Sequence, residues 1–337
     1  MSGYSRETLN GTLPDGRQIR TVTLDNGTLS ATVLDFGAAL QDLRRTGVDF
    51  PLVLGSPDAA AYGRILSLFG TVIGPVANRI GGAEARIDGT PHRFEANENA
   101  CNTLHSGAAS THTKTWEIET QDETSVTLRI ELPDGEGGFP GNKVIRSRYA
   151  LEGDTLIHEL TGTTDAATLM NLAHHGFWTA QPPESWGGQL LTIHADAYLP
   201  TDDQTLPTGE IRPVEGTPFD FRSARLLDPA TDPDFDHNFC LTRAPGPLRP
   251  ALRLESPETG VVLEMSTTAP GLQVFGMHKF SVEGDETIHG HPYPRHAAFA
   301  FEPQMWPDAP GRDDWPAIDL APAETFRQLA TWRVTKV

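Results

Sequence analysis

The residues that most constrain the fold are 126–132, because their hydrophobic pattern alternates without a break. Side chains of a β-strand point alternately to opposite faces, so apolar residues at every second position indicate a strand with one buried face. The residues expected to face inward are Val126, Leu128, Ile130 and Leu132, and those expected to face solvent are Thr127, Arg129 and Glu131. This segment is the best strand candidate in the chain.

Segments of the same kind recur along the chain, and no long helical periodicity accompanies them. Further strands are predicted at 21–24, 28–34, 34–40, 143–151, 156–160, 189–195, 261–267, 272–275 and 332–337. Asn26-Gly27 predicts a tight hairpin turn, residues 85–89 carry a second hairpin signal, and 57–63 allows a short helical turn. The 32 Gly and 27 Pro residues are spread evenly, as many turns require. We therefore predict an all-β sandwich or barrel of antiparallel sheets, folded as one domain over residues 1–337.

The net charge narrows the classes of partner. A formal charge of −19 argues against nucleic acid, whose phosphates need a basic surface, and more weakly against anionic sugar phosphates. Two cysteines, Cys101 and Cys240, make neither a disulfide framework nor a zinc site. No apolar run approaches the ~20 residues of a membrane helix, and the N-terminus lacks the apolar segment of a signal peptide. We expect a cytoplasmic protein that binds neither nucleic acid nor membrane.

A carboxylate closes another predicted strand, which covers residues 295–302 and is ended by Pro303. Its aromatic residues, Phe299 and Phe301, would face the core, and its opposite face would carry His296, Ala298, Ala300 and Glu302. Small side chains beside a carboxylate leave space for a small ligand. Read alone, Glu302 is more often an ordinary surface residue at a strand end, so its function depends on a partner elsewhere.

Histidines offer that partner. On a strand, His175 would share a face with Asn171, Ala173 and Phe177. His105 stands after the polar loop 95–102, and polar loops on a β scaffold commonly carry function. Taken singly, His175 is as often a buried structural histidine, His105 is more often an ordinary loop residue, and Asp236 is more often a turn former.

Other chemistries find less support. His289-Gly290-His291 and His174-His175 suggest a metal site, yet no cysteine accompanies them. Neither the G-x-S-x-G elbow of a serine hydrolase nor a Gly-rich phosphate loop is present. An imidazole can donate a proton near neutral pH and an ionised Glu can accept one. We therefore interpret these residues as an acid–base site without metal or cofactor, suited to opening and closing a sugar hemiacetal.

An ordered set of segments carries a resemblance over nearly the whole chain. The segments are 74–80, 102–107, 133–141, 171–177, 195–200, 209–214, 217–222, 236–239, 270–273, 301–304 and 307–308. In this order and spacing the sequence resembles the aldose 1-epimerase (galactose mutarotase) family. It differs from the usual family pattern at Pro75, His174, Phe177, Pro303 and residues 274–278, so our hypothesis is a divergent branch that acts on a neutral aldose different from galactose.

The resemblance implies a large single-domain β-sandwich that interconverts the α and β anomers of a free neutral aldose. It implies that Glu302 is the base for the anomeric hydroxyl proton and that His175 is the acid for the ring oxygen. The positions that would bind the sugar are Asn78, Arg79, His105, Phe177, Asp236 and Gln273. These roles require an ionised Glu302 and a protonated His175 in the free site, and they predict a bell-shaped pH–rate profile around neutrality.

Three alternatives stay open at this point. A non-catalytic carbohydrate-binding protein would keep the scaffold without needing the acid–base pair. A glycoside hydrolase or lyase on a related β scaffold would need a second carboxylate near Glu302, for which Asp236 is the candidate. A sugar-phosphate epimerase fits less well because the chain is acidic. The sequence leaves the oligomeric state as monomer or homodimer.

Overall fold

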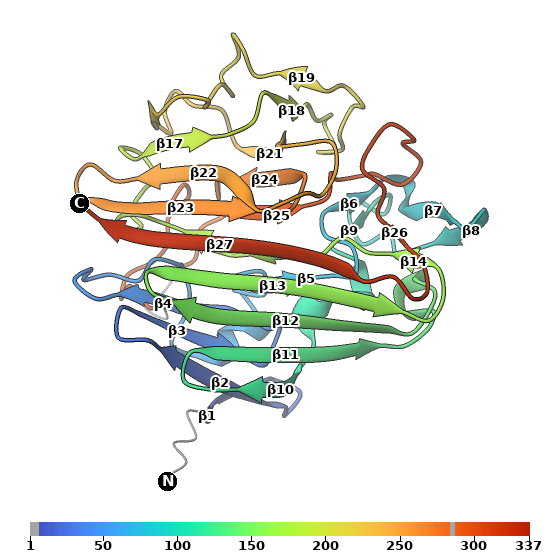
Figure 1. Cartoon of the computed structure of the whole chain (residues 1–337), viewed down its shortest axis with the longest axis horizontal. Helices are drawn as coiled ribbons and strands as arrows, with labels where there is room; N and C mark the ends of the chain where they lie inside the picture. The colour runs from blue at the N-terminus through green and yellow to red at the C-terminus, as the bar shows by residue number, and fades with distance from the viewer. Residues whose placement is uncertain (1–6, 284–286) are drawn as a thin grey trace.

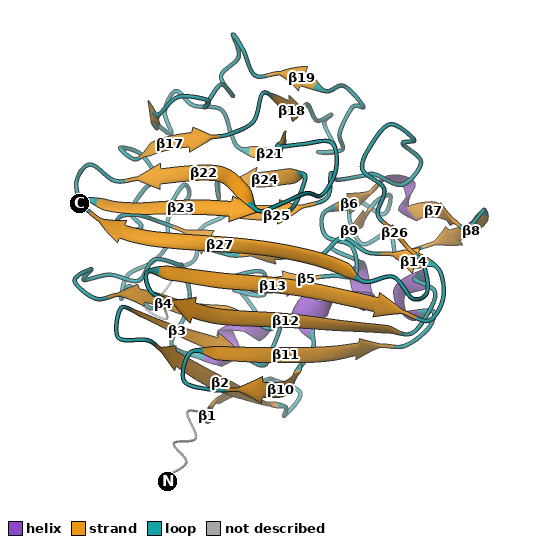
Figure 2. Cartoon of the chain, viewed as in Figure 1, coloured by secondary structure: helices purple, strands orange, loops and turns teal. Residues whose placement is uncertain are grey.

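The computed structural model describes residues 7–283 and 287–337, and within them β-strands dominate (Figures 1 and 2). The largest sheet has nine antiparallel strands, in the order β10 (Glu117–Gln121), β11 (Ser125–Leu132), β12 (Lys143–Glu152), β13 (Thr155–Thr164), β27 (Phe326–Lys336), β23 (Val261–Thr267), β22 (Arg249–Glu255), β17 (Leu190–Ile193) and β20 (Arg225–Leu226). Its long strands lie side by side across the front of Figure 1.

Two further sheets complete the main body. One has the order β1 (Glu7–Thr12), β2 (Gln18–Asp25), β3 (Leu29–Leu34) and β4 (Leu40–Arg45). The other has the order β16 (Phe177–Trp178), β25 (Phe299–Gln304), β24 (Gly271–Phe275), β21 (Asp236–Cys240), β18 (Ala197–Leu199) and β19 (Arg212–Pro213). Residues of all three sheets share one hydrophobic core, in which the rings of Trp178 and Trp332 stack 3.7 Å apart. The arrangement is a β-sandwich, as predicted.

Short elements fill the edges. Four two-stranded pairs are β5 (Thr71–Ile73) with β15 (Ala173–His175), β6 (Arg79–Ile80) with β9 (Thr103–Leu104), β7 (Glu84–Ile87) with β8 (Thr90–Arg93), and β14 (Thr168–Leu169) with β26 (Asp319–Leu320). The helical segments of the described residues are single 3₁₀ turns: η1 (Ala59–Gly63), η2 (Gly81–Ala83), η3 (Gly107–Ala109), η4 (Thr111–Thr113) and η5 (Glu136–Gly138). Within residues 7–283 and 287–337, no helix has the length and apolar character needed to cross a membrane.

Most predicted strands are confirmed, and their faces follow the sequence pattern. The four inward residues of β11 are buried, and the Asn26-Gly27 turn joins β2 to β3. The predicted strand at 34–40 is wrong: β3 ends at Leu34 and β4 begins at Leu40. Between them Gly37 and Ala38 have positive φ, and the Gly37 N–H donates to the Lys114 carbonyl instead of to a ladder. β17 is shorter than predicted, and β27 is longer.

The predicted end of a strand at Pro303 is also wrong. β25 begins at Phe299, because His296 has a φ of 63°, and it runs through Pro303 to Gln304. β16 pairs with β25 only at Phe299 and Ala300, so one side of β25 is open at Pro303. The Pro303 carbonyl points to that open side and accepts a hydrogen bond from Gln328 Nε2 at 2.8 Å. The missing N–H of proline therefore removes no ladder bond.

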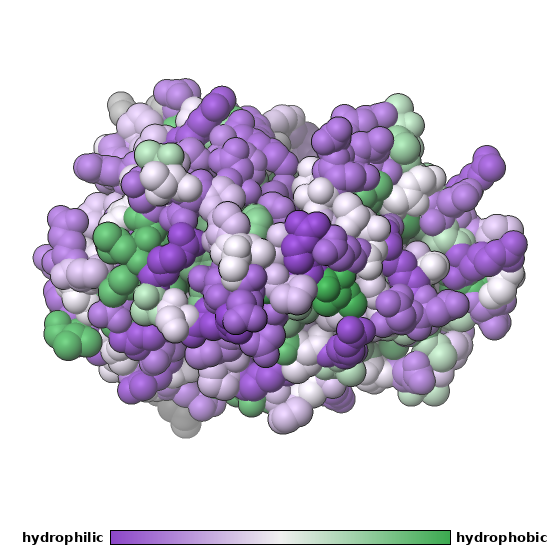
Figure 3. Space-filling view, turned by 90° about the horizontal axis from the view of Figure 1, so that it is seen from above, coloured by the Kyte–Doolittle hydropathy of each residue, from purple (hydrophilic) through white to green (hydrophobic). Residues whose placement is uncertain are grey.

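The molecular surface agrees with the acidic composition. The face in Figure 3 is mostly hydrophilic, with hydrophobic residues in small separate groups. Among the described residues, the large hydrophobic side chains that are exposed are Leu9, Ile65, Leu226, Leu248 and Val337. They come from distant parts of the chain, and scattered exposed apolar side chains of this kind are normal in folded proteins.

Lys143 is a buried lysine that ties down the loop before β12. It is fully buried, and its Nζ donates hydrogen bonds to the carbonyls of Phe139, Pro140 and Gly141. Burial lowers the pKa of Lys143 to about 8. We predict that Lys143→Met lowers the free energy of unfolding by about 1–3 kcal/mol, because buried carbonyls lose their donor. Urea denaturation at pH 7 measures the change.

Lys336→Met is the matched control for that substitution. Lys336 is exposed and its Nζ donates to a single carbonyl, that of Gly47. Losing an exposed contact is expected to change the free energy of unfolding by less than about 0.5 kcal/mol. Equal stabilities of the two variants would contradict the role given to Lys143.

Candidate active site

Adjacent strands of the six-stranded sheet bring the candidate carboxylate beside two polar residues. Gln273 on β24 lies opposite Glu302 on β25, and Asp236 on β21 lies opposite Phe275. Gln273 and Phe275 are two positions apart on one strand, so they share a face. Glu302 is 2% exposed, and its Oε2 has no hydrogen-bond partner among the described residues. An uncompensated buried carboxyl group is costly to keep, which points to a ligand-binding role.

His175 approaches Glu302 from a different strand pair. It ends β15, whose partner β5 aligns Thr71 with His175. His175 Nε2 lies 3.6 Å from Glu302 Oε1, and both side chains are nearly buried. His175 Nδ1, like Glu302 Oε2, has no hydrogen-bond partner in the described part of the chain. The two groups are near enough for one substrate oxygen, placed beside the pair, to contact both.

A reciprocal backbone contact positions His105. The pairing of β6 with β9 aligns Arg79 with Leu104, and the next residue, His105, bonds to Asn78 twice. The Asn78 N–H donates to His105 Nδ1 at 3.1 Å, and the His105 N–H donates to the Asn78 carbonyl at 2.9 Å. Because Nδ1 is the acceptor, the neutral ring carries its proton on Nε2. The His105 and His175 ring centroids are 5.7 Å apart, edge to face.

Two charged pairs complete the walls. Arg79 makes a bidentate pair with Glu98, with Nε–Oε2 at 2.8 Å and Nη2–Oε1 at 2.7 Å. Asp236 is held on both oxygens: Oδ1 accepts from Gln273 Nε2 at 2.9 Å and Oδ2 pairs with Lys279 Nζ at 2.6 Å. Each cation in the lining is therefore neutralised by a carboxylate, which suits an uncharged ligand.

These groups surround one cavity of about 230 Å³. It is lined by Leu68, Asn78, Arg79, Glu98, Leu104, His105, His175, Asp236, Gln273, Phe275, Lys279, Phe280 and Glu302. Seven of the eight residues predicted for the site belong to this lining, and the eighth, Phe177, does not. Phe177 is fully buried beneath the wall, where its ring stacks on Phe69 at 4.3 Å and contacts His175 at 5.3 Å between centroids.

Sequence reasoning missed several lining residues. Glu98 lies in the polar loop that the sequence singled out, but nothing in that loop distinguishes one carboxylate from another. Phe275 could have been found, since strand alternation puts it on the face of Gln273. Lys279 and Phe280 directly follow the segment that departs from the family pattern. They belong to no strand, so no periodicity could position them.

Comparison with known proteins decides the family. The aldose 1-epimerase family model matches residues 20–330. The galactose mutarotase of Homo sapiens is 32% identical over 335 residues, covering 96% of both chains, and the aldose 1-epimerase of Escherichia coli K12 is 29% identical, covering 95% of this chain and 96% of its own. The chain belongs to the aldose 1-epimerase family.

Solved structures agree with this family assignment. The GalM/aldose epimerase homologue from C. elegans superposes with a TM-score of 0.87 at 28% identity, covering 94% of this chain and 99% of its own. Galactose 1-epimerase from Lactobacillus acidophilus superposes with a TM-score of 0.82 at 25% identity, covering 98% of each chain. The predicted resemblance, the β-sandwich fold and the aldose 1-epimerase (mutarotase) activity, an isomerase activity, are confirmed.

Burial shifts the pKa values of both members of the candidate acid–base pair. It raises the pKa of Glu302 to about 8, with the negative charge of Asp236 adding to the shift. It lowers the pKa of His175 to about 4. Desolvation disfavours the charged form of both groups. Both shifts favour the uncharged forms, which is opposite to the ionised Glu302 and protonated His175 expected from the sequence, and the working protonation states stay a prediction.

The other candidate metal residues are held by protein groups. His289 contacts the Tyr293 hydroxyl and the Pro51 carbonyl, and His174 faces the rings of His158 and Tyr149. Within the described residues, no group of three or more His, Cys, Asp and Glu side chains has the spacing to hold a metal ion. Both cysteines are unpaired.

Proposed function

We propose that Glu302 and His175 form the acid–base pair by which this family member interconverts the anomers of a free neutral aldose. The observation that supports the assignment is the 3.6 Å separation of His175 Nε2 and Glu302 Oε1 in a cavity of about 230 Å³. A hemiacetal oxygen that lies beside this pair would be within hydrogen-bond reach of both groups, as proton transfer requires. Neither group has a competing partner on its other acceptor atom in the described residues.

The chemistry needs one proton removed and one delivered. One group takes the proton of the anomeric hydroxyl while the other protonates the ring oxygen, and the bond between C1 and the ring oxygen breaks. Rotation about C1–C2 turns the aldehyde, and reclosure with reversed roles forms the other anomer. In this assignment Glu302 is the base and His175 is the acid.

The uncharged forms favoured by burial are compatible with this chemistry. A protonated Glu302 with a neutral His175 holds the same number of protons as an ionised Glu302 with a protonated His175. One proton transfer converts the first state into the second, and a bound sugar oxygen in contact with both groups supplies the path. The pair therefore titrates as a unit with two apparent pKa values.

We predict a bell-shaped dependence of kcat/KM on pH, with a broad plateau between the two limbs. Activity falls below pH of about 4, where His175 is protonated and the pair holds two protons. It also falls above pH of about 8, where Glu302 is ionised and the pair holds none. Polarimetry of freshly dissolved sugar, corrected for the spontaneous rate at each pH, measures the profile. A profile without limbs between pH 3 and 9 would contradict the assigned pair.

The cavity supports a single neutral monosaccharide as substrate. Sites for larger ligands usually enclose roughly 300–1,000 Å³, above the size of this cavity. We propose that the sugar hydroxyls bind to Asn78, Arg79, His105, Asp236 and Gln273. Phe177 supports the wall from behind instead of touching the sugar. A glycosidase would need a free second carboxylate, and Asp236 is engaged on both oxygens.

The decisive experiment is polarimetry on a panel of neutral aldoses. We expect faster approach to anomeric equilibrium for at least one of glucose, galactose, arabinose and fucose. Because residues 274–278 depart from the family pattern, we expect a divergent specificity in which no single hexose dominates. No acceleration with any of these sugars would overturn the proposed function, and one dominant rate with galactose or glucose would overturn the specificity prediction. The single domain, the cytoplasmic location and the monomeric or homodimeric state remain predictions.

A further inference from the structure

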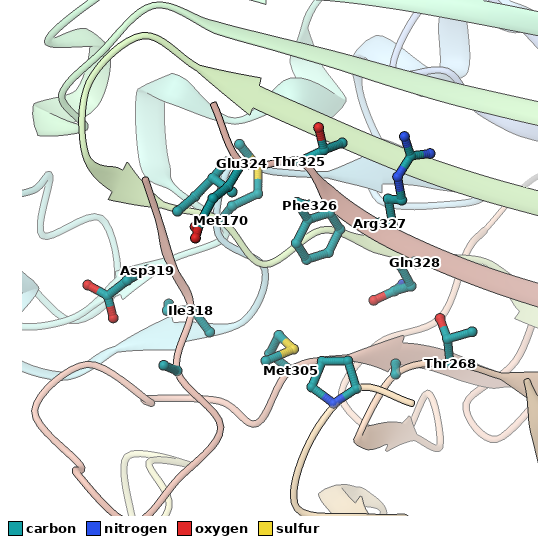
Figure 4. Close-up of a pocket in the computed structure, with 14 residues that line it drawn as sticks. Met170, Thr268, Met305, Ile318, Asp319, Glu324, Thr325, Phe326, Arg327 and Gln328 are labelled. Carbon is teal, nitrogen blue, oxygen red and sulfur yellow. The ribbon is translucent and has the colours of Figure 1, made fainter. Parts of the chain in front are cut away.

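A second and larger cavity, of about 490 Å³, lies where β23 separates from β27 (Figure 4). It shares no lining residue with the acid–base cavity. Its floor is apolar and well packed: the side chains of Met170, Met305 and Ile318 are each at most 5% exposed. The ring of Phe326 lies across from them in Figure 4. Its volume falls in the range of small-molecule sites.

The wall of this cavity contains an open stretch of strand. β23 pairs with β27 as far as Ala330. At the next residue, Leu329, the carbonyl accepts a hydrogen bond from the Thr268 N–H, and the Leu329 N–H donates to the Thr268 hydroxyl. The chain turns away at Pro270. Main-chain groups of an antiparallel strand point to the same side at every second residue. Arg327 is two residues before Leu329, so its N–H and C=O point to the same side of β27. No strand of the described residues lies opposite them there.

These main-chain groups restrict the ligand. A donor and an acceptor on one residue match a ligand edge that carries an acceptor and a donor side by side, as a carboxamide or an amino-heterocycle does. One open residue is too short for a peptide strand, which needs several consecutive pairs. Gln328, 5% exposed, also ends in this space, and its Nε2 is occupied by the Pro303 carbonyl, which leaves its oxygen as an acceptor.

The remaining groups determine the shape and charge of the ligand. Two thioethers opposite an aromatic ring suit a flat ring, because sulfur and aromatic groups interact favourably. The charged rim consists of Asp319, Glu324 and Arg327, so it carries one net negative charge. This balance disfavours phosphate and carboxylate groups on the ligand.

We propose that this cavity is a binding site for a neutral planar heteroaromatic amide or amine, the size of a nicotinamide or nucleobase ring. The ring lies between Phe326 and the methionine side chains, and its donor–acceptor edge pairs with the main chain of Arg327. The site is independent of the sugar chemistry, since it uses none of the residues assigned to it.

Methionine methyl NMR of the full chain tests this proposal directly, because only five methionines are present. Nicotinamide and adenine are the probes. We expect saturable shifts of the Met170 and Met305 methyl signals. Met265 and Met277 are buried and do not line this cavity, so they serve as internal references that do not move. The absence of saturable shifts with both probes, or equal shifts of all four signals, would overturn the proposal.

A blocking variant checks the location. Ala317 is an exposed residue of the cavity lining, so Ala317→Trp fills the cavity without disturbing the core. It is expected to abolish the shifts, whereas Ala230→Trp, on an exposed turn elsewhere, leaves them unchanged. Persistence of the shifts in Ala317→Trp would overturn the site. The Glu302→Gln variant is expected to bind both probes as the wild type does, so failure of the proposed catalysis and failure of this site are distinguishable.

The ligand chemistry has its own test. Adenosine 5′-monophosphate is expected to bind at least about tenfold more weakly than adenine, a difference of about 1.4 kcal/mol, because its phosphate meets the acidic rim. Toluene, which has a flat ring but no donor or acceptor, is expected to give weaker shifts than nicotinamide. Equal affinity for toluene and nicotinamide would overturn the role of Arg327.

Discussion

Replacing Glu302 by Gln is expected to lower kcat for anomer interconversion roughly 10²- to 10⁴-fold, because an amide cannot exchange the proton that the carboxyl group gives and takes. The substitution keeps the size of the side chain. It also keeps the charge at pH 7, since burial raises the pKa of Glu302 to about 8 and leaves the carboxyl group protonated. We therefore expect a folded protein at neutral pH that is at least as stable as the wild type, with polarimetry reporting close to the spontaneous rate.

The same variant tests the raised pKa through stability. The folded-state pKa lies above the unfolded value, so the wild type binds more protons when folded, and stability is lost as the pH rises towards and through about 8. The melting temperature of the wild type should fall relative to that of Glu302→Gln between pH 5 and 9. Glu302→Asp, which keeps the acid but shortens its reach, should retain intermediate activity. A Gln variant with wild-type kcat would remove Glu302 from the mechanism.

Replacing His175 by Asn is the second change with a large expected effect, again roughly 10²- to 10⁴-fold in kcat. Asn can still hydrogen-bond, but it neither accepts nor releases a proton in the working range. The acid limb of the pH profile, near pH of about 4, should disappear together with the activity. If the variant is slow but its pH profile keeps the acid limb, that limb reports the titration of another group. His105 is then the nearest candidate.

His174→Asn provides a matched control for this change. His174 is the neighbour of His175 on β15 and equally buried, at 5% exposure. It faces the other way, towards Tyr149 and His158, and burial lowers its pKa to about 3. We expect His174→Asn to keep wild-type kcat and the wild-type pH profile. If both variants lost activity equally, the loss would reflect the packing of β15 and not the chemistry of His175.

The sequence predicted the strands whose hydrophobic pattern is set by one buried face, such as β11. The strand predictions were wrong at Gly37 and Pro303, where the main-chain conformation and its hydrogen-bond partners determine the bounds of the strand. Gly37 looks like part of a strand, and its positive φ became visible only with the contact it makes to Lys114. Pro303 looks like a strand end, and it is accommodated because β16 stops short of it. Such partners are remote in the chain, so no local pattern contains them.

The candidate site shows a similar division. The family resemblance predicted that Glu302, His175 and His105 belong to one site, although they lie on different strands and loops. Their protonation states could not be read from the sequence, because the pKa shifts arise from burial that only the packed structure defines. The resemblance predicted that Phe177 touches the sugar, yet its ring is buried against Phe69, because β15 ends at His175 and Phe177 begins a separate strand, β16.

The cavity is lined partly by residues on strands and partly by residues in a loop, and these two groups can evolve differently. Glu302, Gln273 and His175 are fixed by ladders, and the Pro303 carbonyl next to Glu302 is tied to the large sheet by Gln328. Lys279 and Phe280 lie outside every strand. Mutations can therefore accumulate in the loop and change which sugar is accepted while the proton-transfer groups stay in position. Directed evolution towards a new aldose should begin with libraries at Lys279 and Phe280 and leave β24 and β25 untouched.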